Sequence, residues 1–448
     1  MADAALSSGA LKSALHAVLP MRPIGHRVDA DIAVPGSKSI TNRALLTGAL
    51  ADGDVTITGG LDADDSRYMA DALRKLGFAL ETSPDRAVIR VRGLGGEIPA
   101  READLSVGNA GTAMRFLAAV VCLGHGRYRL DGSAHMRRRP IGDLVDGLRE
   151  LGVRARCELE NGCPPVLIEA EGLPGGRIKV KGEHSSQYIS AVLLAAPYAR
   201  APLEVEVTGE FVSKPFVELT RRVMEDFGVP TAKEGERLFR PAHGRRYRAG
   251  EYAVEGDATA ATYFLAAAAI LGGRVAVTNV RADSPQGDAR FAGVLERMGC
   301  RVRRGFLPGG YGLEVSREPG SPLRAIAADL NDMPDTAQTA AAAALFAEGT
   351  TRLTNLANLR VKETDRLAAL RAELTRLGAR VEEGPDWIEI APGERRAAVV
   401  ETYDDHRMAM ALALVGLGRE GVAVRNPGCV SKTYPAYFRD LERLRGDA

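Results

Sequence analysis

The chain has 448 residues, of which 45% are hydrophobic and 26% charged, as in ordinary globular proteins. Lys and Arg exceed Asp and Glu by only 59 − 58 = 1, so no overall field draws the chain to nucleic acid or to a membrane surface. No run reaches the roughly 18 apolar residues of a membrane span. The length predicts two or three domains, and we expect any bound anion to be held by local groups of cations.

Residues 1–20 carry little net charge and no clear cleavage site, and we expect a disordered extension, with a transit peptide as the alternative. The five cysteines form no Cys-x-x-Cys pair, and their odd number argues against a disulfide framework. Reduced thiols are typical of the cytoplasm, where we expect the protein to reside. Seven scattered histidines predict no metal site, and no dinucleotide or P-loop motif occurs.

The first informative motif is Pro35-Gly36-Ser37-Lys38-Ser39-Ile40-Thr41-Asn42-Arg43. A strand-like run, Ile32–Val34, ends at the Pro-Gly break, and a helix is predicted to begin at Ser39. Helix N-termini carry unpaired N–H groups and a partial positive charge, so they hold anions well. Lys38 lies just before this start and Arg43 four residues after it. The segment therefore predicts a site for the phosphate or carboxylate of a small acidic ligand.

Two kinds of helix alternate along the chain, and each is predicted six times. The first kind starts with a short polar residue followed by small apolar residues, near Ser39, Asn109, Ser185, Asp257, Asp335 and Asp405. The second kind is amphipathic and ends on glycine, at Asp65–Gly77, Ile141–Gly152, Pro215–Gly228, Asp288–Gly299, Glu363–Gly378 and Tyr434–Gly446. A period of roughly 70–78 residues indicates repeated supersecondary units, the alternative being chance spacing in an α/β protein.

The residues of each repeat indicate its structure. Ser, Asn and Asp are favoured N-caps, and glycine ends helices in the left-handed conformation. The Ala-, Leu- and Met-rich helices lack a polar face and should be buried on all sides. Short runs such as Val55–Thr58, Leu203–Val207 and Val275–Val277 predict strands. Each unit is then strand–helix–strand–helix–strand–strand, with three units in each of two domains, and six helix N-termini could converge on one interdomain cleft.

Polar residues at several of these starts could bind a ligand or simply cap a helix. Gly111, two residues after Asn109, would let a ligand approach the backbone closely. Ser185, Ser186 and Gln187 offer two hydroxyls and an amide that suit a phosphate ester, although capping explains one of the serines.

The same ambiguity holds in the last third of the chain. Asp335 alone is best explained as a cap. Val361–Arg366 is typical of a solvated, salt-bridged helix face, yet Lys362 and Arg366 lie four residues apart, which predicts one helical face, and could both reach a cleft. Asp404–Arg407 either caps a helix or presents an arginine to a carboxylate, and Lys432 adds another cation.

Nine short motifs, taken in chain order, resemble those of a known protein family. They are PGSKSITNRALL (35–46), GNAGTAMR (108–115), SSQ (185–187), VSKP (212–215), GDATAATYF (256–264), MPD (333–335), RVKETDR (360–366), DHRMAM (405–410) and SKTYP (431–435). Together they closely resemble the 5-enolpyruvylshikimate-3-phosphate synthases, enolpyruvyl transferases of the shikimate pathway. The resemblance implies a two-domain inside-out α/β barrel of six βαβαββ repeats. Residues 35–254 would form the shikimate 3-phosphate-side domain, and residues 1–34 with 255–448 the phosphoenolpyruvate-side, catalytic domain.

The resemblance also implies the reaction and its residues. Shikimate 3-phosphate and phosphoenolpyruvate would give the enolpyruvyl ether and phosphate through a tetrahedral intermediate, with no cofactor and no metal. The implied catalytic residues are Lys38, Asp335, as proton acceptor from the 5-hydroxyl, and Glu363, as acid–base group at the methylene carbon. Shikimate 3-phosphate would be bound by Lys38, Ser39, Arg43, Ser185, Ser186, Gln187, Ser213, Asp335, Asn358 and Lys362. Phosphoenolpyruvate would be bound by Lys38, Gly111, His135, Gln187, Arg366, Arg407 and Lys432. A monomer is implied, with no nucleic-acid or membrane partner.

Three residues depart from the family's pattern. His135 stands where an arginine usually contacts phosphoenolpyruvate, although a charged His135 or the neighbouring Arg137 could substitute. Phe116 replaces a usual proline, and Phe216 a usual tyrosine. We expect weaker phosphoenolpyruvate binding than in typical members.

Two rival functions are weighed against this one. The sister enolpyruvyl transferase that acts on UDP-N-acetylglucosamine carries a cysteine before Arg-Pro-Ile, whereas Ser133–Arg138 contains none. The second rival is a non-catalytic or RNA-end-processing protein on a similar fold. The balanced charge and the absence of a basic or aromatic strip in the sequence argue against binding to nucleic acid.

Overall fold

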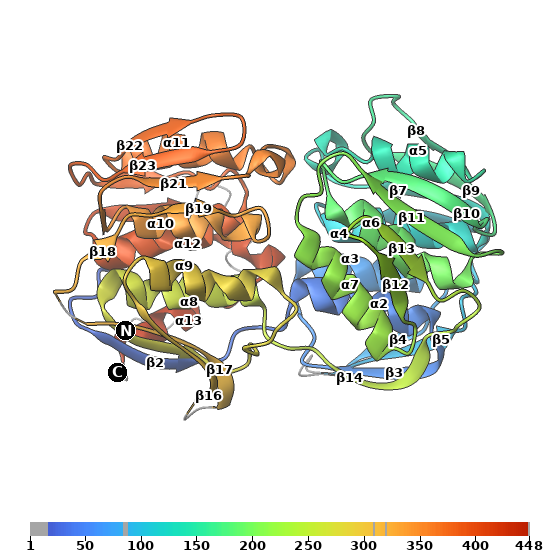
Figure 1. Cartoon of the computed structure of the whole chain (residues 1–448), viewed down its shortest axis with the longest axis horizontal. Helices are drawn as coiled ribbons and strands as arrows, with labels where there is room; N and C mark the ends of the chain where they lie inside the picture. Colours follow the sequence, from blue (N-terminus) through green and yellow to red (C-terminus); the bar gives the residue numbers. More distant parts are fainter. Residues whose placement is uncertain (1–16, 84–87, 308–309, 319, 447–448) are drawn as a thin grey trace. The chain divides into compact units, whose positions relative to one another are not determined.

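The computed structural model describes residues 17–83, 88–307, 310–318 and 320–446, so most of the predicted N-terminal extension lies outside the described residues. The chain forms two compact units (Figure 1). The central unit is Gly36–Glu255, and the terminal unit combines Met1–Pro35 with Gly256–Ala448. Each unit has a hydrophobic core made of its own residues.

The central unit contains three four-stranded sheets, each combining one parallel and two antiparallel pairings. Their strand orders are β14-β3-β5-β4, β6-β7-β9-β8 and β10-β11-β13-β12. The strands are β3 (Asp52–Thr58), β4 (Leu80–Thr82), β5 (Val88–Leu94), β6 (Glu102–Ser106), β7 (His125–Asp131), β8 (Arg154–Cys157), β9 (Val166–Glu171), β10 (Gly176–Lys181), β11 (Leu203–Thr208), β12 (Thr231–Glu234), β13 (Leu238–Pro241) and β14 (Arg248–Ala253). The helices are α2 (Lys38–Leu50), α3 (Asp64–Lys75), α4 (Gly111–Val120), α5 (Gly142–Glu150), α6 (Ser186–Ala195) and α7 (Lys214–Asp226), with 3₁₀ turns η1 (Val121–Leu123), η2 (Met136–Arg138) and η3 (Ala196–Tyr198).

The terminal unit repeats this plan with variations. Its four-stranded sheets are β16-β17-β15-β2 and β19-β21-β23-β22, beside the three-stranded β1-β25-β24 and the pair β18-β20. The strands are β1 (Val18–Pro20), β2 (Val28–Ile32), β15 (Gly273–Val277), β16 (Arg301–Leu307), β17 (Gly310–Arg317), β18 (Leu323–Arg324), β19 (Ala327–Asp329), β20 (Ala347–Glu348), β21 (Thr351–Thr354), β22 (Arg380–Glu383), β23 (Ile388–Ala391), β24 (Ala398–Val400) and β25 (Val422–Arg425). The helices are α8 (Ala258–Leu271), α9 (Phe291–Arg297), α10 (Ala337–Ala344), α11 (Arg366–Arg376), α12 (His406–Gly418) and α13 (Tyr437–Glu442), with 3₁₀ turns η4 (Gly287–Arg290), η5 (Pro334–Thr336), η6 (Ala357–Val361), η7 (Pro427–Lys432) and η8 (Arg443–Arg445).

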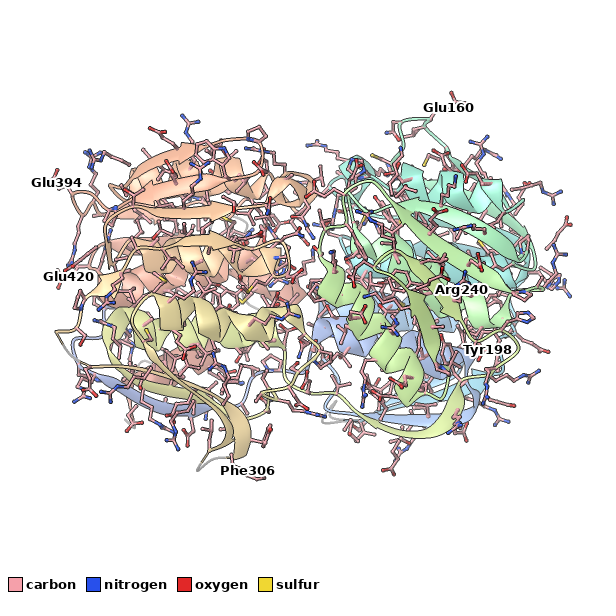
Figure 2. The ribbon with its side chains drawn as sticks, viewed as in Figure 1. Glu160, Tyr198, Arg240, Phe306, Glu394 and Glu420 are labelled. Carbon is pink, nitrogen blue, oxygen red and sulfur yellow. The ribbon has the colours of Figure 1, made fainter. Side chains whose placement is uncertain are left out.

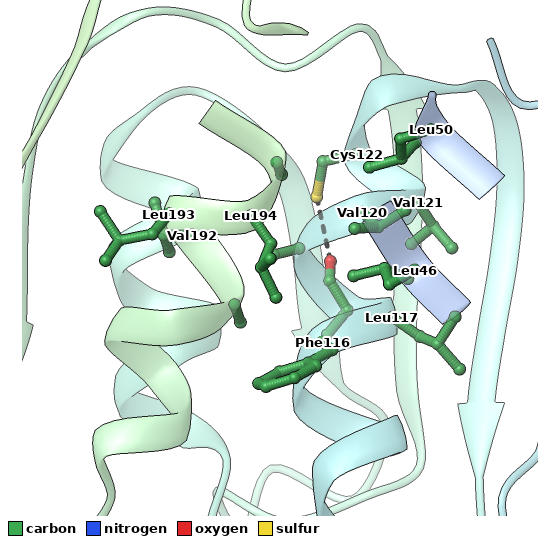
Figure 3. Close-up of a cluster of buried hydrophobic side chains, with 14 of the residues drawn as sticks. Leu46, Leu50, Phe116, Leu117, Val120, Val121, Cys122, Val192, Leu193 and Leu194 are labelled. Carbon is green, nitrogen blue, oxygen red and sulfur yellow. Dashed lines mark hydrogen bonds between the residues drawn. The ribbon is translucent and has the colours of Figure 1, made fainter. Parts of the chain in front are cut away.

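Small apolar residues place three helices in the middle of each unit, as the sequence predicts. Every residue of α4 is buried, and α8 is buried from Ala258 to Ile270. Helices α8, α10 and α12 contact one another within the terminal unit (Figure 1). In the central unit, Leu46, Leu117 and Leu194 meet in the core between three helices (Figure 3). Charged side chains such as Glu160, Glu394 and Glu420 point outward (Figure 2).

Glycine ends the six amphipathic segments as predicted. Gly77, Gly152, Gly228, Gly299, Gly378 and Gly446 all have φ between 79° and 104°. This left-handed conformation costs glycine no Cβ clash.

The strand order departs from six identical repeats. Segments β6–β9 and β10–β13 follow the predicted order along the chain, but the first sheet of each unit takes an edge strand from elsewhere, β14 in the central unit and β2 in the terminal unit. The predicted hairpin after β25 is not found, because no strand follows β25 among the described residues. Strand β1 pairs antiparallel there instead, with Val18 opposite Arg425. With three residues, β1 is too short to be predicted as a strand from its sequence pattern.

Several predicted helix starts shift by a few residues. Ser37, not Ser39, caps α2, accepting a bond from the Ile40 amide at 3.4 Å, so Lys38 lies inside the helix. Asn109 does not cap α4, whose N-cap is Ala110. Asp335 lies within the turn η5 rather than at a cap. The N-caps predicted at Ser185, Asp257 and Asp405 are confirmed by their side-chain bonds to backbone amides.

Candidate active site

The N-terminal halves of α2, α4 and α6 are linked by side chains in the central unit. Gln187 Nε2 donates to Thr112 Oγ1 at 3.4 Å, joining α6 to α4. Arg43 Nη2 donates to Ser190 Oγ at 3.3 Å, joining α2 to α6. Three N-terminal ends with partial positive charge therefore gather at one end of this unit.

Arg43 is a buried cation whose hydrogen-bond acceptors in the described structure are all neutral. It donates to the Ser39 and Phe216 carbonyls at 2.8 and 2.9 Å, to Thr220 Oγ1 at 2.8 Å and to Ser190. Its guanidinium carbon lies 5.0 Å from the centroid of the Phe116 ring. Burial lowers the pKa of Arg43 to about 9. A bound anion would offset the cost of burying this charge.

Lys38 and Asp65 form an ion pair near the start of α2. Lys38 Nζ lies 3.7 Å from Asp65 Oδ2, with side chains 13% and 3% exposed. Ser39 is half-buried in the same turn. Asp65, which the sequence indicated only as the start of an amphipathic helix, is therefore a partner of the predicted catalytic lysine.

Gly111 makes room for an arginine at the start of α4. A Cβ atom at Gly111 would lie 2.7 Å from Arg139 Nη2. Arg139 is buried and donates to the Asn109 carbonyl at 3.3 Å. A cation thus covers the N-terminus of α4, and no pattern in the sequence distinguishes Arg139 from Arg137 and Arg138.

Three predicted serines of the central unit lie at helix starts. The Ser185 hydroxyl accepts from the Gln187 amide at 3.2 Å, and Ser186 is buried beside it. Ser213 is buried at the N-cap of α7, where its φ of 56° is left-handed.

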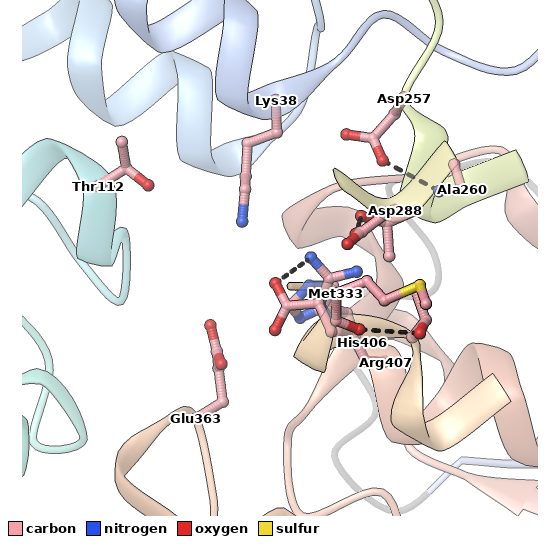
Figure 4. Close-up of polar contacts among 12 residues, drawn as sticks. Lys38, Thr112, Asp257, Ala260, Asp288, Met333, Glu363, His406 and Arg407 are labelled. Atoms are coloured by element: carbon pink, nitrogen blue, oxygen red, sulfur yellow. Dashed lines mark hydrogen bonds and ion pairs between the residues drawn. The ribbon is translucent and has the colours of Figure 1, made fainter. Parts of the chain in front are cut away.

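The terminal unit holds a compact group of carboxylates and cations around the buried Arg366. Two members of this group, Glu363 and Arg407, are labelled in Figure 4. Arg366 binds Asp405 through Nε and Nη2 at 2.7 and 3.2 Å. It also donates to Asp335 at 2.9 Å and to Glu363 at 2.8 Å. Burial opposes its charge, but these three carboxylates hold the pKa of Arg366 above its ordinary value.

Two further cations complete this group. Arg407 Nη2 donates to Asp335 Oδ2 at 2.9 Å, and Lys432 Nζ forms an ion pair with Glu363. Burial opposes the charge of Arg407, but nearby acids, Asp335 foremost, raise its pKa well above normal. Asp335 is thus held between Arg366 and Arg407, and Glu363 between Arg366 and Lys432. Two oriented carboxylates beside cations suit proton transfer on an anionic substrate.

The remaining predicted residues of this unit lie just before α11. Asn358 is buried in η6, and Lys362 follows that turn. Helix α11 begins only at Arg366, capped by Asp365, so Lys362 and Arg366 do not share a helical face as predicted.

The predicted site residues therefore fall into two groups, one in each unit. Lys38, Ser39, Arg43, Gly111, His135, Ser185, Ser186, Gln187 and Ser213 belong to the central unit, and Asp335, Asn358, Lys362, Glu363, Arg366, Arg407 and Lys432 to the terminal unit. In the part of the chain that the structure describes, no cluster of three or more His, Cys, Asp or Glu side chains could hold a metal. None of the described helices combines the length and apolar character that crossing a membrane requires.

Comparison with known proteins identifies the family. The family model described as EPSP synthase (3-phosphoshikimate 1-carboxyvinyltransferase) matches residues 23–441. The chain belongs to the EPSP synthase family. It is 46% identical over 429 residues to the 3-phosphoshikimate 1-carboxyvinyltransferase of Sulfurovum sp. (strain NBC37-1), covering 95% of this chain and 99% of that protein. It is 45% identical over 419 residues to the enzyme of the same name from Trichormus variabilis, covering 94% and 97%.

Two solved structures share this fold. The EPSP synthase of Acinetobacter baumannii superposes with a TM-score of 0.79 at 26% identity, over 95% of this chain and 98% of that one. The enolpyruvyl transferase NikO of Streptomyces tendae shares the fold, with a TM-score of 0.76 at 20% identity.

His135, predicted to stand where the family usually has an arginine, lies in surroundings that differ from those expected for a substitute cation. His135 is half-buried, and its imidazole forms no hydrogen bond or ion pair with the described residues. Arg137 binds Asp131 through two bonds of 2.9 and 2.6 Å, and this pairing raises the pKa of Arg137. Arg137 is therefore committed to a carboxylate, whereas Arg139 lies over Gly111.

Proposed function

We propose that this member of the EPSP synthase family transfers the enolpyruvyl group of phosphoenolpyruvate to the 5-hydroxyl of shikimate 3-phosphate and releases phosphate, a step of aromatic amino-acid biosynthesis. The observation that carries the proposal is the arrangement of Asp335 and Glu363, each held between two cations. The reaction needs one carboxylate for the attacking hydroxyl, one for the methylene carbon, and cations for two anionic substrates.

In this proposal, shikimate 3-phosphate binds chiefly to the helix starts of the central unit. Arg43 offers a buried positive charge that lacks a carboxylate among its hydrogen-bond acceptors. Ser185, Ser186 and Gln187 offer hydroxyl and amide groups to the phosphate, and Lys38, Ser39 and Ser213 complete this set. Asn358, Lys362 and Asp335 are contributed by the terminal unit.

Phosphoenolpyruvate is held by Arg366, Arg407 and Lys432, together with Lys38, Gln187, His135 and the backbone at Gly111. When it binds, phosphoenolpyruvate replaces Asp335 as a partner of Arg407 and Glu363 as a partner of Lys432. This exchange frees Asp335 and Glu363 to contact the reacting groups. Binding of the substrate and readying of the two acid–base groups are then a single event.

The chemistry follows from these positions. Asp335 accepts the 5-hydroxyl proton as the oxygen attacks C2 of phosphoenolpyruvate, and C3 gains a proton, which gives a tetrahedral ketal phosphate. C3 then loses a proton as the C2–O bond to phosphate breaks, with Glu363 serving C3 in both steps. Lys38 and the arginines stabilise the charge on the phosphate that leaves. Glu363 takes a proton from solvent before the addition, gives it to C3, and takes a proton back from C3 in the elimination. The 5-hydroxyl proton that Asp335 holds returns to solvent after phosphate leaves. No cofactor takes part in this scheme.

The proposal requires residues of both units at one pair of substrates. It includes the inside-out barrel arrangement of six βαβαββ repeats, the assignment of the central unit to shikimate 3-phosphate and of the terminal unit to phosphoenolpyruvate, and a monomer in the cytoplasm. It also includes weak phosphoenolpyruvate binding, because His135 replaces an arginine and Arg137 is paired with Asp131.

Phosphate release tests the proposed function. The purified full chain is incubated with phosphoenolpyruvate and either shikimate 3-phosphate or UDP-N-acetylglucosamine. We expect phosphate with the first acceptor only. Phosphate with the second would identify the sister activity, and no phosphate with either would refute enolpyruvyl transfer.

A further inference from the structure

Asp288 is a buried carboxyl group to which the proposed reaction gives no role. It lies in the turn η4, which Gln286 ties to the start of α8: the Ala258 amide donates to Gln286 Oε1 at 3.1 Å, and Gln286 Nε2 donates to the Gly256 carbonyl at 2.8 Å. One oxygen of Asp288 accepts from the Thr259 hydroxyl. The other, Oδ1, is buried and has no hydrogen-bond partner among the described residues. A carboxylate so placed is costly when ionised.

The groups around Asp288 couple it to the reacting residues of the terminal unit (Figure 4). The charges of Asp335 in η5, Arg407 in α12 and Asp257 at the N-cap of α8 all influence the pKa of Asp288. Tyr263, further along α8, acts on Arg407.

The other charged side chains on the elements that pack here are engaged elsewhere. On α9, Glu296 pairs with Arg304, and Arg297 donates to the Ala327 carbonyl. Arg290, on η4 itself, pairs with Asp332. Asp288 therefore responds mainly to two carboxylates and one arginine.

Burial, and then the negative charge of Asp335, raise the pKa of Asp288 to about 7. Its proton is therefore present in weakly acidic solution and lost in weakly basic solution. Each change adds or removes a negative charge within range of Arg407.

We propose that Asp288 is a positioning residue for Arg407, and that its charge sets how strongly Arg407 holds phosphoenolpyruvate. This inference rests on the proposed function, in which Arg407 binds that substrate. When Asp288 is protonated, the charge of Arg407 is available to the ligand. When Asp288 is ionised, it attracts Arg407 and repels the anion. Binding of phosphoenolpyruvate in weakly basic solution therefore takes up one proton, which Asp288 receives from solvent.

Kinetics across pH test the inference on the full chain. Asp288→Asn imitates the protonated form in shape and charge, and Asp283→Asn removes an exposed carboxylate from the same segment as a control. Between pH 6 and 9 we expect the KM for phosphoenolpyruvate of the unsubstituted chain to rise about ten-fold relative to that of Asp288→Asn. Asp283→Asn should follow the unsubstituted chain. Ionisation of the substrate affects all three proteins alike, so the KM ratio isolates Asp288.

A constant KM ratio in an active enzyme would overturn the inference and leave the proposed function standing. Absence of phosphate from the unsubstituted chain would overturn both. If Asp288→Asn does not fold, Thr259→Val provides the test. This variant removes a hydroxyl whose hydrogen bond favours the ionised form of Asp288. The pH at which KM rises should then move upward, and Thr259→Ser should restore it. An unmoved pH in Thr259→Val would also overturn the inference.

Thermal unfolding without substrate gives a readout that is independent of turnover. The folded chain keeps the Asp288 proton up to about pH 7, whereas an unfolded aspartate loses it near pH 4. The folded state thus binds more protons between these values, and stability falls there as pH rises. The Tm of Asp288→Asn should rise relative to that of the unsubstituted chain from pH 4 to 7 and then stay level. A Tm difference independent of pH would show that Asp288 does not titrate, and would overturn the inference.

Discussion

Arg43 and Arg366 are both buried, yet their surroundings differ in charge. Arg366 meets three carboxylates of its own unit, so its charge is balanced before any ligand arrives. Arg43 meets neutral acceptors and the face of Phe116, and burial lowers its pKa. The first arrangement orients the two carboxylates that we propose as catalytic groups, and the second provides the positive charge that we propose for an anionic substrate.

At this scale, the sequence identified which side chains are polar groups at helix starts, but not their partners. The ion pair of Lys38 with Asp65 joins two helices, and the bonds of Arg366 to Asp335 and Asp405 span 31 and 39 residues of sequence. Such pairs depend on tertiary packing, which no local pattern contains. Arg139 could not be distinguished from its neighbours, because only the space left by Gly111 selects it.

His135→Arg tests the expected weakness of phosphoenolpyruvate binding. A charge-assisted hydrogen bond contributes about 1.5–3 kcal/mol, which corresponds to roughly a 10- to 150-fold decrease in KM. We expect the KM for phosphoenolpyruvate to fall toward this range, with little change for shikimate 3-phosphate, in steady-state phosphate-release assays. His125→Arg, which adds the same charge at an exposed position of the central unit, should change neither KM. An unchanged KM in His135→Arg would show that position 135 does not reach the substrate.

At the scale of elements, most of the predicted site residues lie at helix starts. At the start of α4, the absence of a side chain at Gly111 lets Arg139 approach closely. The periodic helices and their C-terminal glycines were predictable, because capping and burial follow local composition. The exact N-caps were less so. In α2, Ser37 and Ser39 are equally good capping residues by type, and only the turn geometry selects Ser37.

Gly111→Ala tests the fit between α4 and Arg139. The new Cβ atom would lie 2.7 Å from Arg139 Nη2, so the guanidinium must move away from the helix start. We expect the KM for phosphoenolpyruvate to rise about ten-fold, consistent with the loss of about 1.4 kcal/mol of binding. The Tm should change little, because a flexible side-chain end can yield.

Gly293→Ala is the matched control, because Gly293 lies in α9, a helix that carries no predicted site residue. Its new Cβ atom would lie 3.8 Å from the nearest atom, Nη2 of Arg304 in strand β16, which is ordinary contact. Weaker phosphoenolpyruvate binding in both variants, or in neither, would contradict a specific role for the contact between Gly111 and Arg139.

At the scale of the whole molecule, the chain begins in the terminal unit, forms the central unit from Gly36 to Glu255, and then returns to the terminal unit. The repeat period predicted two groups of three buried helices, and each group has its own core. The period did not predict which strands would be exchanged. Strands β14, β2 and β1 join sheets far from their neighbours in sequence, and a repeat pattern contains no signal for such closure.

In the proposed function, residues of both units act on one pair of substrates within a single chain. Lys38→Met in the central unit and Glu363→Gln in the terminal unit test it directly, with Lys75→Met and Glu420→Gln as exposed controls. Turnover is measured as phosphate release with shikimate 3-phosphate and phosphoenolpyruvate, for each variant and for an equimolar mixture of Lys38→Met and Glu363→Gln.

We expect each site variant to lose at least about a hundred-fold in kcat, as for removal of a general acid–base or charge-stabilising group. The exposed controls should retain full activity, and the mixture should remain inactive, because one chain contains one complete set of groups. Full activity in either site variant would show that its unit does not take part. Recovery of activity in the mixture would show that the site is shared between chains.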